Sequence, residues 1–334
     1  MISLSRTEIE ALIDFDSIAP AIEEAYRASS AGNVTLPPVG HITFPDVGAD
    51  CHIKYGHLKG QDSFVIKVAT GFPSNTAQGL ETGNGVVLVM SAKTGAVQAV
   101  LHDEMRLTDI RTGIGGAIAS RTLACTDSQR VLILGTGPQA HRQIEAHVAL
   151  MPTPLRFELW GRNTDRAVEQ VKMLSQKFDV THVSDLQNAV ECADIIITAT
   201  GATAPLIHSD WVQQGTHITA VGADAPGKQE LDPKLVARAD IVAVDLVHQC
   251  IDHGEVSHAF RAGLIQQSDL IELGTLLQDA RKTRSNASQI TIADLTGIAA
   301  QDIAIATSIL NAYTKYPANS GRHSHRKDTP TNNT

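Results

Sequence analysis

The sequence is poor in aromatic residues, has no excess of positive charge and contains no long hydrophobic run. Aromatic side chains make up 4% of its 334 residues and the formal net charge is −9, which argues against a basic, base-stacking surface for nucleic acids. No run of about 18 apolar residues occurs, so no membrane-spanning helix is predicted. The first residues lack a basic stretch followed by an apolar segment, so we expect no signal peptide. We therefore predict a cytoplasmic protein without nucleic-acid or membrane partners.

Metal-binding and redox motifs are lacking as well. The four cysteines form no CxxC pair, which predicts free thiols in a reducing compartment. Among the 14 histidines, His248, His253 and His258 follow one another at intervals of five residues, which puts them on different faces of a helix. Zinc-binding helices use intervals of three or four residues, so we predict no metal site. The cysteines are Cys51, Cys125, Cys192 and Cys250.

The first hundred residues have the texture of a mixed α+β unit. Ser5 and Glu8 have the spacing of a helix-capping box, and apolar residues on one face predict a helix over 17–29 that stops at Gly32. Short β-rich runs separated by Gly, Pro, Asn and Asp then predict an antiparallel sheet or partial barrel. These runs are 52–55, 63–69, 85–91 and 96–101.

From residue 130 onward, short apolar runs alternate with helical stretches. The runs are apolar throughout, as in strands that are buried on both faces, and the pattern predicts a doubly wound parallel sheet. A last run, 289–294, precedes a helix predicted over 299–316. The predicted fold class is therefore α/β, with a Rossmann-type doubly wound parallel sheet plus an N-terminal α+β domain. The other apolar runs are 131–135, 155–160, 194–200, 216–222 and 240–245.

The segment RVLILGTGPQAHRQ, residues 130–143, joins a buried strand to a helix through a glycine-rich turn. Gly135 permits the tight turn, Gly137 lets the backbone approach a pyrophosphate, and Ala140 completes the GxGxxA spacing. The strand, the helix and the further βα units supply the context that a lone glycine motif lacks. A structural turn is the alternative. The pattern favours a dinucleotide-binding loop formed by Gly135, Thr136, Gly137, Pro138, Gln139 and Ala140.

The end of the second strand of this sheet indicates which dinucleotide binds. An acidic residue there would bind the ribose 2′-hydroxyl of NAD(H), but the sequence has Gly161, Arg162, Asn163 and Thr164. Arg162 can bind a 2′-phosphate, which favours NADP(H), and a solvated arginine is the alternative. Both NADP(H) and NAD(H) stay open as the cofactor, with NADPH preferred.

Five segments of the chain, in this order, resemble the ornithine cyclodeaminase/mu-crystallin family. They are FVIKVATGFPSN (64–75), LTDIRTGIGGAIASR (107–121), LGTGPQA (134–140), VGADAPGKQEL (221–231) and LTGIAAQD (295–302). The resemblance implies a homodimer formed through the N-terminal domain, and a Rossmann domain inserted between that domain and the C-terminal helix. The implied division is 1–115 with 299–317 for substrate binding and dimerisation, 116–298 for NAD(P) binding, and 318–334 for a polar tail expected to be disordered.

The resemblance also implies roles for single residues. Lys67 and Arg111 match the cations that hold the substrate carboxylate, and Asp224 matches the catalytic acid/base, with Lys67 a second candidate catalytic residue. From spacing alone, the lysine could reach the surface from its strand, the arginine could be a helix-surface charge and the aspartate could be a turn residue. The resemblance favours the functional roles. Further cofactor contacts are expected at Thr82, Thr112, Thr200, Gly222 and Ala223.

One departure from the family concerns the substrate pocket. Relatives carry an arginine after a proline in the segment matching LPPVGHITF, residues 36–44, and this sequence has none there. Counted back from Lys67 without a gap, Lys54 stands where cyclodeaminases carry a glutamate. We hypothesise that Lys54 replaces the missing arginine as a carboxylate ligand. The pocket would then repel the distal ammonium group of ornithine.

These residues suit the reduction of an imino acid. The reaction needs an anchored carboxylate, a stabilised iminium nitrogen and a site that excludes water. We predict an NAD(P)-dependent oxidoreductase acting on CH–NH or CH–NH2 groups of a small imino or amino acid, most specifically a reductase that converts Δ1-pyrroline-2-carboxylate to L-proline. The alternatives are an ornithine cyclodeaminase that forms L-proline and ammonia, a linear imino acid reductase or alanine dehydrogenase, and a crystallin-like binding protein. The intact Asp224–Lys228 segment argues against the last.

Overall fold

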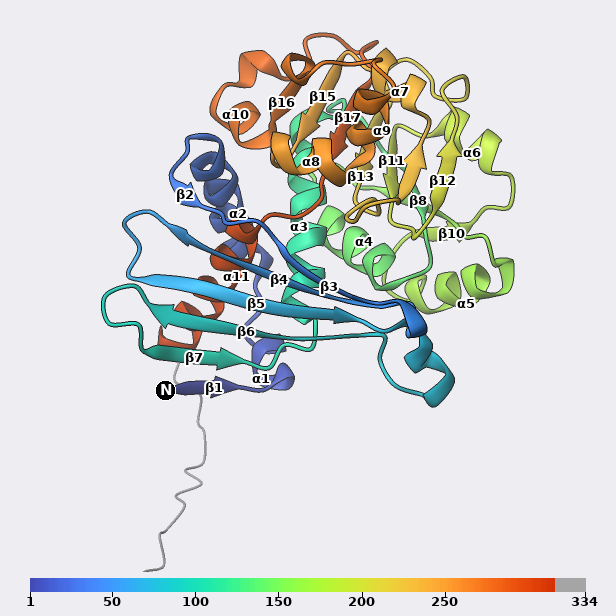
Figure 1. Cartoon of the computed structure of the whole chain (residues 1–334). Helices are drawn as coiled ribbons and strands as arrows, with labels where there is room; N and C mark the ends of the chain where they lie inside the picture. The colour runs from blue at the N-terminus through green and yellow to red at the C-terminus, as the bar shows by residue number, and fades with distance from the viewer. Residues whose placement is uncertain (316–334) are drawn as a thin grey trace, which may run out of the picture.

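The computed structural model describes residues 1–315, and the tail predicted over 318–334 lies outside the described residues. Two large sheets with their covering helices, and a small third sheet, make up this part of the chain (Figure 1). The N-terminal sheet lies below the second sheet in that view, and helix α3 (Arg106–Leu123) runs between them. Among residues 1–315, no helix has both the length and the apolarity to cross a membrane.

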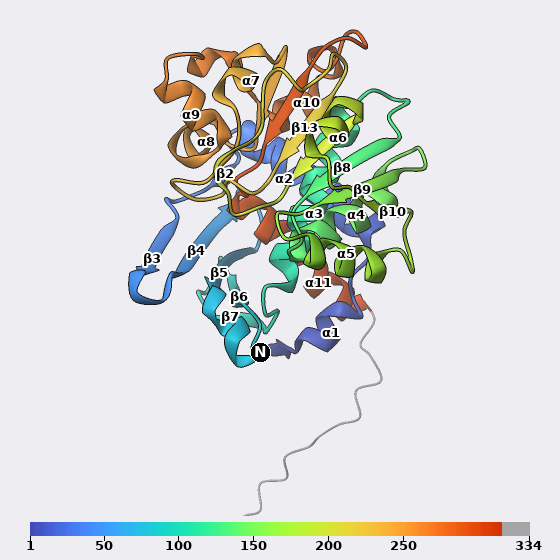
Figure 2. The same cartoon turned by 90° about the vertical axis from the view of Figure 1, so that its right-hand side faces the viewer.

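The N-terminal sheet has the strand order β1-β7-β6-β5-β4-β2, and β3 pairs with β4. All its pairs are antiparallel except that of β1 with β7, so the antiparallel sheet predicted for this region is present. The β3–β4 hairpin reaches out from the edge of the sheet (Figure 2). The strands are β1 (Ile2–Leu4), β2 (Val34–Thr35), β3 (Gly40–Phe44), β4 (Ala49–Leu58), β5 (Ser63–Gly71), β6 (Gly83–Ser91) and β7 (Val97–Leu101).

One face of this sheet is covered by helices that come from both ends of the chain. Helix α1 (Arg6–Glu10) begins at the predicted capping box, in which the Ser5 N–H donates to Glu8 Oε2 over 2.9 Å. Helix α2 (Phe15–Ser30) begins before the predicted residue 17 because the Asp14 side chain caps it. With α3 and α11 (Ala299–Lys315), it encloses a core that includes residues of β5, β6 and β7. The C-terminal helix therefore completes the N-terminal unit.

The other face of the N-terminal sheet is apolar but open. Side chains alternate along each strand, so the neighbours of the buried Val65 and Val89 point away from the helices. Tyr55 is 39% exposed and Ile42 on β3 is 50% exposed. Half-buried apolar residues fill the area between them, namely Ile53, Phe64, Ile66, Val68, Val86, Leu88, Met90 and Val100.

The second sheet is parallel throughout, with the order β10-β9-β8-β11-β13-β17-β15-β16, and this confirms the predicted fold class. Both faces are buried: Leu132 and Leu134 of β8 enter one core, while Val131 and Ile133 enter another. The strands are β8 (Arg130–Leu134), β9 (Arg156–Trp160), β10 (Val180–His182), β11 (Ile195–Thr198), β13 (His217–Ala220), β15 (Ile241–Val244), β16 (Leu270–Glu272) and β17 (Thr291–Asp294).

The chain leaves β8 in one direction to form β9 and β10, and crosses to the other side to form β11 and β13. A crevice for ligands is expected outside the carboxyl ends of strands at such a switch point. A small sheet of β12 (Thr203–Ile207) and β14 (Gln229–Leu231) lies at that edge. The helices are α4 (Pro138–Leu150), α5 (Thr164–Leu174), α6 (Leu186–Cys192), α7 (Pro233–Arg238), α8 (Val247–His253), α9 (Glu255–Arg261) and α10 (Leu273–Gln278).

The predicted division of the chain at residues 115 and 116 falls inside α3, which is one continuous helix. This helix packs against α2 and α11 of the N-terminal unit and against β13 and β17 of the second sheet. The domain boundaries therefore stay a prediction. What the structure does show is that two segments, α3 and residues 295–298, connect the two sheets.

Candidate active site

The glycine-rich turn lies at the switch point of the parallel sheet. Gly135 has a φ of 128°, and a Cβ atom there would lie 2.5 Å from the Ala199 carbonyl oxygen, so the position requires glycine. Gly137 is the N-cap of α4, and a Cβ atom there would meet no atom within 4 Å. The turn therefore borders open space, a cavity of about 390 Å³. Its lining includes Gly135, Thr136, Gly137, Arg162, Asn163 and Thr200 among the predicted cofactor residues.

The other predicted cofactor residues lie around this turn in different settings. Pro138 and Thr82 line a second cavity of about 600 Å³ between the two sheets, together with Asp224. The Gln139 side chain donates to Asp109 Oδ1 over 3.0 Å, and so joins α4 to α3. The other predicted cofactor residues line neither cavity. Ala140 and Ala223 are buried, and Thr164 is the first residue of α5. The Thr112 carbonyl oxygen accepts from the Gln143 side chain over 3.2 Å, and the Gly222 N–H donates to a carboxylate.

That carboxylate belongs to Glu230, a fully buried residue that the sequence analysis did not single out. It accepts the Thr200 N–H over 2.7 Å and the Gly222 N–H over 3.0 Å, and so joins the segments that follow β11 and β13. Burial raises its pKa, and the hydrogen bonds oppose that rise. Glu230 lies in the short strand Gln229–Leu231, and nothing in the sequence showed that it is buried or which two N–H groups it accepts.

Four charged side chains gather between β4, β5, α3 and α11. Lys54 and Lys67 are directly opposite each other on β4 and β5, so both ammonium groups point into the interior. Asp302 Oδ1 accepts from Lys67 Nζ over 2.8 Å and from Arg111 Nε over 3.2 Å. All four residues are buried. Asp302 lies in the segment 295–302 that resembles the family, but its role as the shared anion was not predicted.

The cluster holds three cations and a single carboxylate, and the pKa values reflect this. Burial lowers the pKa of Lys67 to about 7, with Asp302 opposing the fall and Arg111 and Lys54 adding to it. Burial alone would raise the pKa of Asp302, but Lys67 and Arg111 outweigh it and hold that pKa below its ordinary value. The cations of the cluster therefore outnumber its one carboxylate, while the buried Asp245 and Asp103 lie close enough to interact with Lys54 and Lys67.

Lys54 is separated from Arg111 by a short loop. Its Nζ donates to the carbonyl oxygens of Gly297 at 2.6 Å and Thr296 at 3.3 Å. Gly297 has a φ of 79°, and a Cβ atom there would collide with the Arg111 guanidinium group. A glycine at this position therefore allows the loop to pass between the two cations.

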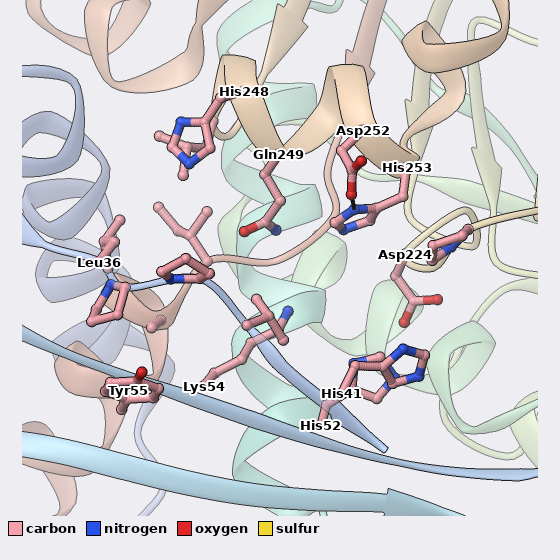
Figure 3. A pocket seen from close by; sticks show the side chains of 17 residues that line it. Leu36, His41, His52, Lys54, Tyr55, Asp224, His248, Gln249, Asp252 and His253 are labelled. Carbon is pink, nitrogen blue, oxygen red and sulfur yellow. Dashed lines mark hydrogen bonds and ion pairs between the residues drawn. The ribbon is translucent and has the colours of Figure 1, made fainter. Parts of the chain in front are cut away.

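Lys54 and Asp224 line the same cavity, of about 400 Å³, between the N-terminal sheet and the second sheet (Figure 3). Asp224 follows β13, and its carboxylate pairs with Lys228 Nζ over 2.5 Å. The Asp224 side chain is 51% exposed. Partial desolvation raises its pKa, but Lys228 and Lys54 outweigh this effect, so the net pKa is lowered and the group is ionised at neutral pH. Lys67 and Arg111 do not belong to this lining and lie beyond Lys54. The remainder combines apolar residues with polar ones. The apolar residues include Leu36, Val39, Leu246 and Ile298, and the polar ones include His41, His52, His248, Gln249 and His253.

Comparison with known proteins shows which family the chain belongs to. The model of the ornithine cyclodeaminase/mu-crystallin family matches residues 1–315. An uncharacterized cyclodeaminase of Sinorhizobium fredii is 38% identical over 300 residues, which cover 88% of this chain and 90% of that protein. The chain therefore belongs to the ornithine cyclodeaminase/mu-crystallin family, as the resemblance predicted.

Solved structures agree with this assignment. An archaeal alanine dehydrogenase dimer with bound NAD superposes with a TM-score of 0.87 at 29% identity, covering 95% of this chain and 97% of that one. The Δ1-pyrroline-2-carboxylate reductase of Thermococcus litoralis, in complex with NADH and L-proline, gives a TM-score of 0.89 at 26% identity, covering 95% and 99%. The fold and these relatives place the chain among the oxidoreductases. The roles of the single site residues stay predictions.

The Asp302 ion pairs generate a stability prediction. Asp302→Asn leaves Lys67 and Arg111 buried without their anion, and we expect the free energy of unfolding to fall by about 3–5 kcal/mol. The pKa of Lys67 should drop below about 7 in the variant, because its main opposing charge is lost. At mildly acidic pH, Lys67 is therefore less protonated in the folded variant than in the folded wild type. The free energy of unfolding of the variant then rises more steeply with pH, so the difference between the two proteins should shrink as the pH rises towards 7.

Urea unfolding of both proteins between about pH 5 and pH 8 measures this loss. Asp279→Asn is a matched control, because Asp279 makes its ion pair with Arg281 at the surface. A loss equal to that of the control, or one that does not change with pH, would contradict the assignment of Asp302 as the shared anion.

Proposed function

We propose that the chain is an NAD(P)(H)-dependent oxidoreductase that reduces the C=N bond of a small 2-imino acid. The observation that carries the proposal is the placement of Asp224 and Lys54 on one cavity, beyond the carboxyl end of β13. Asp224 also borders the neighbouring cavity, which is lined by Thr82 and by Pro138 of the cofactor loop. A carboxylate, a cation and a dinucleotide loop therefore converge at the interdomain cleft, where reactions can be shielded from water.

The residues at the switch point fit a nicotinamide dinucleotide. The open space at Gly137 and the N-terminus of α4 suit a pyrophosphate, whose charge the helix N-terminus favours. The nicotinamide ring of such a cofactor supplies or accepts a hydride when it is bound. The archaeal dehydrogenase with NAD and the Thermococcus reductase with NADH support this cofactor class.

The charged cluster suits the carboxylate of the substrate. Lys54 reaches the cavity directly, and its hydrogen bonds go to neutral carbonyl groups, so its charge is free to bind an anion. Behind Lys54, the two positive charges of Lys67 and Arg111 exceed the one negative charge of Asp302, and this adds positive potential at Lys54. A carboxylate held there fixes the orientation of the reacting carbon beside Asp224.

Asp224 acts on the nitrogen of the substrate. Because its pKa is lowered, the carboxylate is ionised and stabilises the positive charge of a protonated imine. In the reverse direction the same carboxylate accepts a proton from the substrate ammonium group. Lys228, 2.5 Å from Asp224, holds it in this ionised state.

The preferred substrate is Δ1-pyrroline-2-carboxylate, which gives L-proline, and the reductase of Thermococcus litoralis supports this choice. A linear imino acid is the second candidate, supported by the archaeal alanine dehydrogenase. An ornithine cyclodeaminase is favoured by the relative in Sinorhizobium fredii but opposed by the buried cation of Lys54, which repels a distal ammonium group. A cyclodeaminase would form proline and ammonia from ornithine without net use of cofactor, and this distinguishes the two reactions.

The role of Asp224 predicts a large loss of rate on Asp224→Asn. The amide cannot stabilise an iminium charge or accept a proton, so kcat for the reduction of Δ1-pyrroline-2-carboxylate should fall about 100- to 10,000-fold. Oxidation of NADPH and NADH, followed by absorbance, measures this. Asp252→Asn is the matched control, because Asp252 lines the same cavity but its side chain is 75% exposed at the rim. Equal losses in both variants would be evidence against the proposed site.

The role of Lys54 predicts an effect on substrate binding. Lys54→Ala removes a charge-assisted contact with the carboxylate, and KM should rise about 10- to 100-fold. The exposed Lys59, which lies just beyond the end of β4, provides the control Lys59→Ala. An unchanged KM in the Lys54 variant would exclude this lysine as a carboxylate ligand. Proline formation from ornithine by that variant, but not by wild type, would show that the cation excludes ornithine.

We further propose that NADPH is preferred to NADH. The proposal rests on Arg162, which lines the cofactor cavity beside Asn163 where NAD-specific sites carry an acidic residue. In Arg162→Ala the KM for NADPH should rise about 10-fold or more, since an ion pair with the 2′-phosphate is lost. The KM for NADH in the same variant is the internal control and should change little. A wild-type enzyme that favours NADH would disprove the preference.

We also propose that the chain forms a homodimer through the open face of its N-terminal sheet. Apolar side chains of five strands, among them Tyr55, Ile66 and Leu88, form a contiguous surface there that would otherwise face water. The archaeal alanine dehydrogenase is a dimer, which supports this proposal. The partner would enclose the sheet and remove the apolar surface from solvent.

A further inference from the structure

Two histidines and an aspartate gather at the mouth of the candidate active site. His41 on β3 and His52 on β4 are directly opposite each other in the antiparallel register, and their rings stack with centroids 4.5 Å apart. Asp50 precedes His52 by two residues on the same strand, so its side chain lies on the same face. One ligand atom from each of the three residues lies within 4.8 Å of the others.

The spacing of these atoms suits a metal ion with tetrahedral ligands. With metal–ligand bonds of about 2.0 Å, neighbouring ligand atoms in a tetrahedral site are about 3.3 Å apart. His52 Nε2 and Asp50 Oδ2 are 3.4 Å apart, which already matches this value. His41 is exposed on an edge strand, so its ring is free to turn towards the other two. The backbone register therefore brings the set together before any ion binds.

The chemistry of the set selects a class of ion. Two imidazole nitrogens and one carboxylate oxygen suit Zn²⁺ and similar divalent transition metals, whereas Mg²⁺ and Ca²⁺ take oxygen ligands. Asp50 contributes the one negative charge among the three ligands. The nearby Asp224 is paired with Lys228, so an incoming ion would face two cations, Lys228 and the buried Lys54.

We propose that His41, Asp50 and His52 form a binding site for Zn²⁺ or a similar divalent transition-metal ion, with its open side towards Asp224. Figure 3 shows the Asp224 carboxylate turned towards the rings of His41 and His52. His52 and Asp224 both line the cavity assigned to the substrate and the cavity beside the cofactor loop. An ion held by the three residues thus sits where these two cavities meet.

Such an ion inhibits the enzyme rather than assisting it. It attracts the Asp224 carboxylate away from Lys228 and from the substrate nitrogen, because a divalent charge is a stronger partner than an ammonium group. It also lies beside His52 and Asp224, which line both cavities. This consequence rests on the proposed function, whereas the binding of the ion does not.

Equilibrium dialysis of the chelator-treated full chain against Zn²⁺, followed by metal analysis, tests the binding directly. We expect one zinc ion per chain for wild type, and an affinity at least about 10-fold weaker in His41→Ala and in His52→Ala. His57→Ala is the matched control, because His57 lies on the same strand and its ring contacts the Gln61 carbonyl oxygen at 2.9 Å. Mg²⁺ should not compete with the bound zinc.

Wild type that binds no zinc, or a His57→Ala variant that loses as much affinity as the other two, would overturn the site. Inhibition is then measured as the zinc concentration that halves the rate of each protein relative to its own zinc-free rate. His41→Ala should need at least about 10 times more zinc than wild type. If zinc binds to the three residues without inhibiting reduction, the metal site stands and the effect proposed for the ion on Asp224 is wrong.

Discussion

The ion pairs of Asp302 with Lys67 and Arg111 hold together the parts of the chain on which the site depends. The three residues come from α11, β5 and α3, so one carboxylate links the C-terminal helix to the N-terminal sheet and to the helix between the two sheets. A buried charge is tolerated only when its partners are in place, because removing one partner leaves the others uncompensated. The position of Lys54 follows from this arrangement, since the loop that precedes α11 supplies its hydrogen-bond acceptors.

Buried carboxylates play a similar structural part along the edge of the parallel sheet. Glu230 accepts two backbone N–H groups from the segments after β11 and β13, and Glu255 accepts those of Glu230 and Leu231. Asp294 accepts the N–H at the start of α9, and burial raises its pKa to about 7. Buried backbone N–H groups need acceptors, and here the acidic side chains supply them and so hold the segments at the edge of the sheet in place.

Much of the fold could be predicted because its signals are local. Continuous apolar runs predicted the buried strands of the parallel sheet, and the glycine-rich motif predicted the tight turn at Gly135 between a strand and a helix, since both depend on neighbouring residues. The predicted helix over 299–316 is present as α11, but periodicity alone could not say that it would pack against the N-terminal sheet.

The candidate site was only partly predictable, because its contacts join residues distant in sequence. Lys54 and Asp224 were named, and the structure brings them to one cavity. Asp302 and Glu230 were not predicted as site residues. The burial of an acidic residue in a helix or a short strand can be recognised only when its partners are known. The His41–His52 pair likewise depends on the strand register, which the sequence does not reveal until the hairpin is placed.

The pKa of Lys67, at about 7, makes the resting protein a mixture of two protonation states at neutral pH. An anionic ligand held beside Lys54, as proposed, would favour the ammonium form of Lys67, so its binding would draw a fraction of a proton from the solution. The heat of binding then depends on the ionisation enthalpy of the buffer. The measured affinity for a carboxylate ligand would then depend on the pH of the solution.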